Sequence, residues 1–175
     1  EIALGDLERA LRSQWAPDEP QGEAGGIVIR DLARYQGRQW ATRRRPWVDR
    51  LASAWLIQRW VDSNARFKFV DANGYVPEKG EIRFDMFDAE YTHEGDACTF
   101  EVLIRRFSLQ DPALFRIAEM IHDIDLKDNK FAHPETAGIS MMIDAIVSRF
   151  SSDEERMARA GVMLEDFYQY FSKAI

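Results

Sequence analysis

The sequence predicts an α+β domain that is predominantly helical and contains a small sheet of two or three strands. Long segments of its C-terminal half have apolar residues at helical spacing, whereas short segments of its first half have the composition and alternation of strands. The chain has 175 residues, of which 46% are hydrophobic and 30% are charged. This size and composition predict one domain with a substantial core, and they exclude disordered, collagen-like and low-complexity chains.

Residues 1–38 are predicted to form an N-terminal helix and a linker that precede a domain of residues 39–175. Apolar residues recur from Ile2 to Trp15 at nearly helical spacing. The APDEPQGEAGG stretch that follows is rich in Pro, Gly and acidic residues, which is typical of a linker. The chain opens without an initiator Met or a signal-peptide pattern, so we expect it to be a processed or excised piece of a longer protein.

Three strands and one helix are predicted in the first part of the domain. Residues 39–42, the ARFKFVDANG segment and the EIRFDMFDAE segment have strand-like composition or alternation. A helix is expected to begin at Pro46, because proline suits the first helical position, and Asp49 complements the helix dipole there. Since this helix separates the first two strands along the chain, we expect them to pair in parallel through a right-handed crossover.

Helices are predicted for most of the remaining chain. Asp96 is a good N-cap residue for the TFEVLIRRF segment, and Asp111 followed by Pro112 is a typical start of the next helix. Pro134 is the expected start of a third helix. A last helix is expected from residue 152 to residue 173, where apolar residues recur at helical spacing.

Charge and cysteine content restrict the classes of partner and compartment. The chain has 23 Lys and Arg against 30 Asp and Glu, a net charge of −7, so we do not expect this chain alone to bind nucleic acid. Its single cysteine precludes an intrachain disulfide and favours a cytoplasmic localisation. No apolar run is long enough to span a membrane, and no nucleotide-cofactor motif such as GxGxxG or GxxxxGK[ST] is present.

Two acid-rich segments that contain histidine are the main candidates for chemistry. They are THEGDACTFE, with His93 and Glu101, and HDIDLKD, in which His122 and Asp125 lie three residues apart on one face of a helix. If the segments meet, their imidazoles and carboxylates predict a site for a divalent metal ion such as Zn, Fe or Mn. The alternative is that these residues form surface ion pairs and contacts at helix ends.

A cysteine and a group of arginines are further candidates. Cys98 is expected near the first turn of its helix, where the dipole stabilises a thiolate, although a buried and inert cysteine is the alternative. Arg45 and Arg50 flank the start of a predicted helix, where they can bind a tetrahedral oxyanion. The alternative for the arginines is a solvated charge run, with Arg50 paired to Asp49 or to an acid of the HDIDLKD segment.

Several long blocks resemble the ChrB-type chromate resistance domain, the C-terminal domain of ChrB proteins. They are RPWVDRLASAWLIQRWVD, FDMFDAEYTHEGDACTFEVLIRRF, DPALFRIAEMIHDIDLKDNKF and PETAGI, in that order. The resemblance implies a bacterial cytoplasmic protein of the stress response to chromate, related to a chromate-responsive regulator. The N-terminal domain credited with DNA binding in that family has no counterpart in this chain. The resemblance also implies that a sulfurtransferase domain can precede such a domain.

The matching blocks contain all the candidate site residues. We therefore predict a mononuclear metal site of His93, Glu101, His122 and Asp125. Arg45 and Arg50 are predicted to supply positive charge for chromate or another small oxyanion, with Asp49 orienting an arginine or a metal ligand. The predicted function is that of a chromate sensor or an accessory detoxification factor, with a homo-oligomer as one expected assembly. The alternatives are a metal-dependent hydrolase or redox enzyme that uses the same residues, with Cys98 as a redox thiol, and a non-catalytic interaction module.

Overall fold

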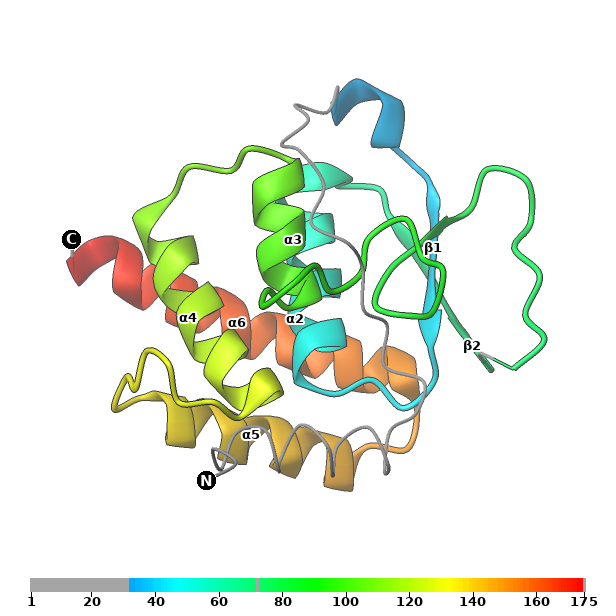
Figure 1. The fold of residues 1–175 in the computed structure, drawn as a ribbon. Helices are drawn as coiled ribbons and strands as arrows, with labels where there is room; N and C mark the ends of the chain where they lie inside the picture. The colour runs from blue at the N-terminus through cyan, green and yellow to red at the C-terminus, as the bar shows by residue number, and fades with distance from the viewer. Residues whose placement is uncertain (1–31, 72, 175) are drawn as a thin grey trace, which may run out of the picture.

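A computed structural model describes residues 32–71 and 73–174, and the predicted helix at residues 2–15 lies outside them. The described chain forms an α+β domain that is predominantly helical, as predicted. Figure 1 shows its elements. In chain order they are a 3₁₀-helix η1 (Leu32–Tyr35), β1 (Gln39–Arg43), α2 (Val48–Leu56), a π-helix η2 (Ile57–Val61), β2 (Arg66–Val70), β3 (Ile82–Arg83), α3 (Thr99–Arg106), α4 (Pro112–Leu126), α5 (Thr136–Arg149) and α6 (Asp153–Ala174).

The sheet has three strands in the order β2-β1-β3, and β1 runs parallel to both neighbours. The predicted parallel pairing of the first two strands is confirmed, with Trp40 of β1 opposite Phe67 of β2. Strand β3 is much shorter than the predicted EIRFDMFDAE strand. It is interrupted because Asp85 has a positive φ of 46°, a conformation that a strand does not accept.

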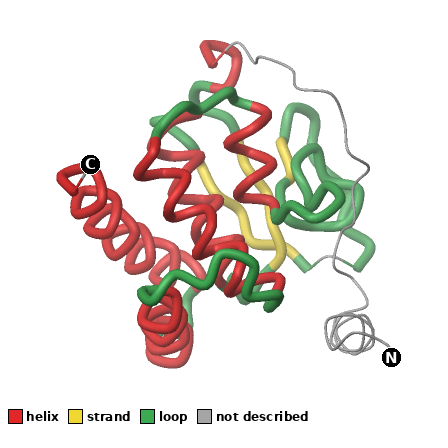
Figure 2. The backbone as a smooth tube through the Cα atoms, turned by 60° about the vertical axis from the view of Figure 1, so that its left-hand side comes forward, coloured by secondary structure: helices red, strands yellow, loops and turns green. Residues whose placement is uncertain are grey.

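The helices gather on one side of the sheet, and the long loop that follows β2 lies on the other side (Figures 1 and 2). Helix α2 is central, because it packs against α3, α4 and α6 and is buried over nearly its whole length. The largest fully buried side chains include Trp40 of β1, Phe84 and Phe100 of α3. Burial of this kind stabilises the fold by about 25 cal/mol for each Å² of apolar surface removed from water.

Residues 32–38, which the sequence assigned to the linker, pack against the domain. The ring of Tyr35 lies 5.0 Å from that of Phe107, centroid to centroid. The carboxylate of Asp62, at the end of η2, accepts hydrogen bonds from the backbone amides of Gly37 (2.7 Å) and Arg38 (2.9 Å). These contacts fix the position of the chain just before β1 begins.

Some predicted helix starts are correct and others are shifted by two residues. Asp111 caps α4 as predicted, since its carboxylate accepts a hydrogen bond from the amide of Leu114 at 3.0 Å. Helix α2 begins at Val48 rather than at Pro46, because Trp47 is still extended. Helix α5 begins at Thr136, two residues after Pro134.

The prediction that Asp96 caps α3 is wrong. The N-cap residue is Cys98, and its amide donates to the carboxylate of Glu101 at 2.9 Å. Asp96 instead forms an exposed ion pair with Lys130 at 3.1 Å.

Among the described residues, none of the helices combines the length and apolar character that a membrane span requires.

Candidate functional site

A buried imidazole surrounded by carboxylates lies where α2, α3, α4 and the loop after β3 meet. The Nε2 atom of His93 lies 3.0 Å from an oxygen of Asp49 and 3.5 Å from oxygens of both Asp85 and Asp125. No residue of the four is more than 8% exposed. We call these four residues the His93 centre. A single nitrogen atom thus faces three carboxylates that come from three different segments.

Each carboxylate of the His93 centre is held by its own segment. Asp49 is in the first turn of α2, and it accepts hydrogen bonds from the amides of Thr99 (2.9 Å) and Phe100 (2.8 Å) at the start of α3. Free amides at a helix N-terminus favour a negative charge, so α3 stabilises the ionised form of Asp49. Asp125 comes from the last turn of α4.

Asp85 has a strained backbone and a charged partner. Its φ of 46° lies in the left-handed region, where Asp is tolerated better than most residues. Its carboxylate pairs with the guanidinium of Arg50 at 2.9 Å and accepts a hydrogen bond from the hydroxyl of Thr99 at 3.2 Å. These contacts offset the backbone strain, which costs on the order of 1 kcal/mol.

The groups of the His93 centre keep one another charged: His93 is held in its protonated form and Asp49 in its ionised form. Burial by itself lowers the pKa of His93, but the hydrogen bond and charge of Asp49, together with the charges of Asp85 and Asp125, raise it to about 9. Burial by itself raises the pKa of Asp49, but His93 and the α3 amides hold it below its usual range. The guanidinium of Arg50 pairs with Asp85, so both Arg50 and the protonated His93 supply positive charge to the carboxylates of this centre.

A second histidine is bound by carboxylates on both sides. The Nδ1 atom of His122 lies 2.7 Å from Glu101, and its Nε2 atom lies 3.1 Å from Asp128. Carboxylates accept hydrogen bonds, so both ring nitrogens carry protons and the ring is positively charged. Although burial lowers the pKa of His122, these two carboxylates raise it above its usual range. We call these three residues the His122 centre.

The His122 centre is closely joined to the loop after α4. Asp123 accepts hydrogen bonds from the amides of Phe131 (3.1 Å) and Ala132 (2.7 Å), and the ring of Phe131 packs edge-on against His122. One oxygen each of Asp123 and Asp128 and one ring nitrogen of His122 lie within 4.8 Å of one another, which makes this a second group that could hold a metal ion. The side chain of Asp128 is 36% exposed, so this centre reaches the surface.

The predicted set of metal ligands is divided between the two centres. The structure brings His93 to Asp125, and it brings His122 to Glu101. The first residues of α3 lie between the two pairs, because Thr99 donates to Asp49 and the amide of Cys98 donates to Glu101. Asp49 belongs to the His93 centre itself, and Arg50 lies beside it.

Arg45 does not share a hollow with Arg50, whose guanidinium pairs with Asp85 of the His93 centre. It lines a separate hollow of about 770 Å³ together with three other arginines and several acidic residues. Its amide donates to the carboxylate of Asp153 at 3.0 Å, next to the start of α6. The arginines of the hollow are Arg43, Arg44, Arg45 and Arg156. The structure therefore does not bring Arg45 and Arg50 together around one oxyanion.

For Cys98 the structure favours the predicted alternative of a buried and inert cysteine over a reactive thiolate. The side chain is fully buried at the start of α3. Burial, followed by the negative charges of Asp49, Glu101 and Asp125, raises the pKa of the Cys98 thiol well above its usual value. These effects outweigh the helix dipole, and a neutral buried thiol is a poor nucleophile and a poor reductant.

Two acidic residues of these centres were missed in the sequence. Asp85 follows a strand, and Asp49 follows the neighbouring parallel strand through a short loop. Carboxyl ends of parallel strands meet at one edge of a sheet, so this order is a signal that could have revealed Asp85. Asp128 lies six residues after His122, beyond the end of α4, and no sequence spacing indicates that it folds back.

The fold and the two centres define a class of protein: a small α+β domain that concentrates imidazole and carboxylate groups around the first turn of one helix. The family model described as ChrB, C-terminal domain, matches residues 40–171. The chain therefore belongs to the family of ChrB C-terminal domains.

A curated relative supports this assignment. Protein ChrB of Cupriavidus metallidurans is 38% identical over 173 residues, which are 98% of this chain and 52% of the relative. The chain thus spans about half the length of the curated relative that it matches. No solved structure matches the chain.

Proposed function

We propose that this chain is a chromate-resistance domain whose His93 centre holds one divalent metal ion. Membership of the ChrB family supports the general role. The observation that carries the metal site is the position of His93 Nε2, within 3.5 Å of three separate carboxylates. One carboxylate is enough to accept the hydrogen bond of a ring nitrogen, whereas a divalent metal ion takes three or four ligands around one point.

Distances within the His93 centre support this proposal. Ligands that lie about 2.1 Å from a metal are about 3.0 Å apart at a right angle and about 3.4 Å apart in a tetrahedron. The distances from His93 Nε2 to Asp49 and Asp85 are 3.0 and 3.5 Å, close to those values, and one ligand atom from each of these three residues lies within 4.8 Å of the other two. One imidazole with several carboxylate oxygens suits Mn, Fe or Zn.

Charge also supports a divalent ion. A doubly charged cation is favoured beside the carboxylates that gather around His93 Nε2. The amides of Thr99 and Phe100 hold Asp49 in place, and Arg50 and Thr99 hold Asp85. Groups that hydrogen-bond to a metal ligand in this way orient the ligand and tune its affinity for the metal.

The hollow at Arg45 supports the oxyanion part of the proposed function. Four arginines line it together with three acidic residues, and two of the arginines, Arg44 and Arg156, pair with Asp71 and Asp153. Guanidinium groups suit a tetrahedral dianion such as chromate. In this proposal the domain is a sensor or an accessory factor that binds chromate at the Arg45 hollow and a metal ion at the His93 centre.

A chromate titration tests the oxyanion site. Chromate is expected to bind the wild-type protein, and Arg45→Gln is expected to weaken binding at least about fivefold by removing one guanidinium. Arg105→Gln, which removes an exposed arginine of α3, is the matched control and keeps the wild-type affinity. Equal affinities of all three proteins would place chromate elsewhere.

Metal analysis of protein purified without a nickel column tests the metal site. The wild type is expected to contain about one equivalent of Mn, Fe or Zn, and His93→Gln and Asp85→Asn are expected to lose it. His122→Gln is the matched control, because it removes the other buried imidazole. A wild type with less than about a tenth of an equivalent after reconstitution contradicts the proposal.

Activity and binding assays distinguish the two alternative functions, a metal-dependent enzyme and an interaction module. Turnover of a phosphoester or of chromate by the metal-loaded protein favours a hydrolase or redox enzyme that uses the same centre. A protein that binds neither metal nor chromate is an interaction module, in which the His93 centre has a structural role.

A further inference from the structure

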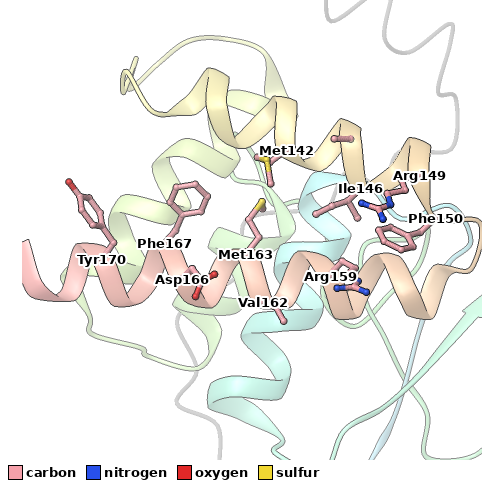
Figure 3. A pocket seen from close by; sticks show the side chains of 11 residues that line it. Met142, Ile146, Arg149, Phe150, Arg159, Val162, Met163, Asp166, Phe167 and Tyr170 are labelled. Atoms are coloured by element: carbon pink, nitrogen blue, oxygen red, sulfur yellow. The ribbon is translucent and has the colours of Figure 1, made fainter.

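An apolar groove runs between α5 and α6 on the surface of the domain (Figure 3). Its volume is about 790 Å³, and its middle is lined by Met142, Ile146, Val162 and Met163. Val162 is 64% exposed and Met142 is 47% exposed. Apolar side chains that gather in an exposed groove mark an interaction surface more often than isolated exposed residues do.

The two ends of this groove carry opposite charges. Arg149 and Arg159 lie at one end, each with its guanidinium about 5 Å from the ring of Phe150, and Asp166 lies toward the other end near Tyr170 (Figure 3). Within the described part of the chain, neither these arginines nor Asp166 has an ion-pair partner. The groove is therefore apolar in its centre, basic at one end and acidic at the other.

The order of these residues along α6 is self-complementary. Arg159 and Asp166 are equally far from the point between Val162 and Met163. They are about 10 Å apart along the helix axis, too far for an ion pair within one chain. If a second α6 crosses this point in the antiparallel direction, Arg159 comes opposite Asp166 of the partner subunit, and the same contact repeats by symmetry.

We propose that the groove between α5 and α6 binds a second copy of this chain and forms a two-fold symmetric dimer. The exposed side chain of Val162 packs at the axis, and the flexible side chain of Met142 fills the space that remains. Each copy contributes one basic and one acidic end, so both charged ends of the groove gain a partner. The proposal does not depend on the metal or oxyanion sites.

Sedimentation velocity of the full chain over a range of concentrations tests the dimer. The wild type is expected to dimerise, and Val162→Glu is expected to weaken the dimer at least about 100-fold by placing a charge at the apolar axis. Val76→Glu changes a valine that is 79% exposed in a loop, and this control keeps the dimer. A wild type that remains monomeric, or a dimer that Val162→Glu leaves intact, overturns the proposal.

Charge reversal tests the antiparallel register. Arg159→Glu and Asp166→Arg are each expected to weaken the dimer about tenfold or more, because each places like charges opposite one another. The double variant, with both changes in one chain, restores opposite charges and is expected to recover most of the affinity. Arg105→Glu is the control for a change of net charge. A double variant that is as weak as the single variants overturns this register.

Discussion

The His93 centre and the His122 centre contain similar groups in different geometries. In the His93 centre one nitrogen atom faces three carboxylates, and each residue is almost fully buried. In the His122 centre each nitrogen has its own carboxylate, and one of these partners reaches solvent. The comparison shows that the same residue types can form two different arrangements, and in our proposal the number of acidic groups around one donor atom is what favours metal binding at His93.

The largest difference between the centres is expected in stability. Asp49→Ala leaves two α3 amides and a charged imidazole without their acceptor, so we expect it to cost about 3–5 kcal/mol of the free energy of unfolding. Asp128→Ala removes a partly exposed carboxylate, and we expect a cost of at most about 1 kcal/mol. Urea denaturation of both metal-free variants measures these values, and equal losses would contradict the comparison.

A pH dependence of stability is expected to follow from the His93 centre. The pKa of His93 is about 9 in the folded protein, above its usual value of 6.5. The protonated ring therefore stabilises the metal-free fold fully below pH 6.5, and this contribution is lost as the pH rises toward 9. The loss is on the order of 3 kcal/mol.

Urea denaturation of the chelator-treated protein at several pH values measures this effect. His93→Gln is expected to show a much flatter profile over the same range, because it lacks the titrating group. A wild type that is equally stable at pH 6.5 and pH 9 would show that His93 is not protonated by its carboxylates.

In the His122 centre, replacing Glu101 by its amide is expected to lower stability moderately. Glu101→Gln keeps the shape of the side chain but weakens its hydrogen bonds to His122 and to the amide of Cys98, at a cost of about 1–2 kcal/mol. The variant is expected to retain its metal content, because Glu101 does not contact His93. Metal analysis and urea denaturation of the same sample check both statements, and loss of metal would assign Glu101 to the metal site.

The smallest effect is expected at Cys98, which lies between the centres. Its buried thiol, with a raised pKa, is expected to react with a thiol reagent on unfolding and very slowly in the folded protein. Cys98→Ala is expected to leave metal content and chromate binding unchanged. Labelling within minutes under native conditions would restore the redox thiol as a candidate.

Local sequence signals predicted much of the fold. Alternation identified β2, the Asp111–Pro112 pair identified the start of α4, and helical spacing identified α6. The starts of α2 and α3 were shifted, because left-handed or extended residues before each helix carry no distinct side-chain signal. Strand β3 was too long in the prediction, since alternation does not reveal the positive φ of Asp85.

The sequence identified most residues of the candidate site, but it did not show how these residues are arranged in space. His93 and Asp125 do meet, and so do His122 and Glu101. Spacing within one helix shows which side chains share a face, but it does not show that the first turn of α3 divides them into two groups. That division depends on the packing of α2, α3 and α4, which no single segment encodes.

Nitrogen NMR of histidine-labelled protein during a Zn²⁺ titration tests the central claim most directly. We expect the Nε2 signal of His93 to change from protonated to metal-bound as one equivalent is added, while both nitrogen signals of His122 stay in place. A coordination shift at His122 together with an unchanged His93 would contradict it.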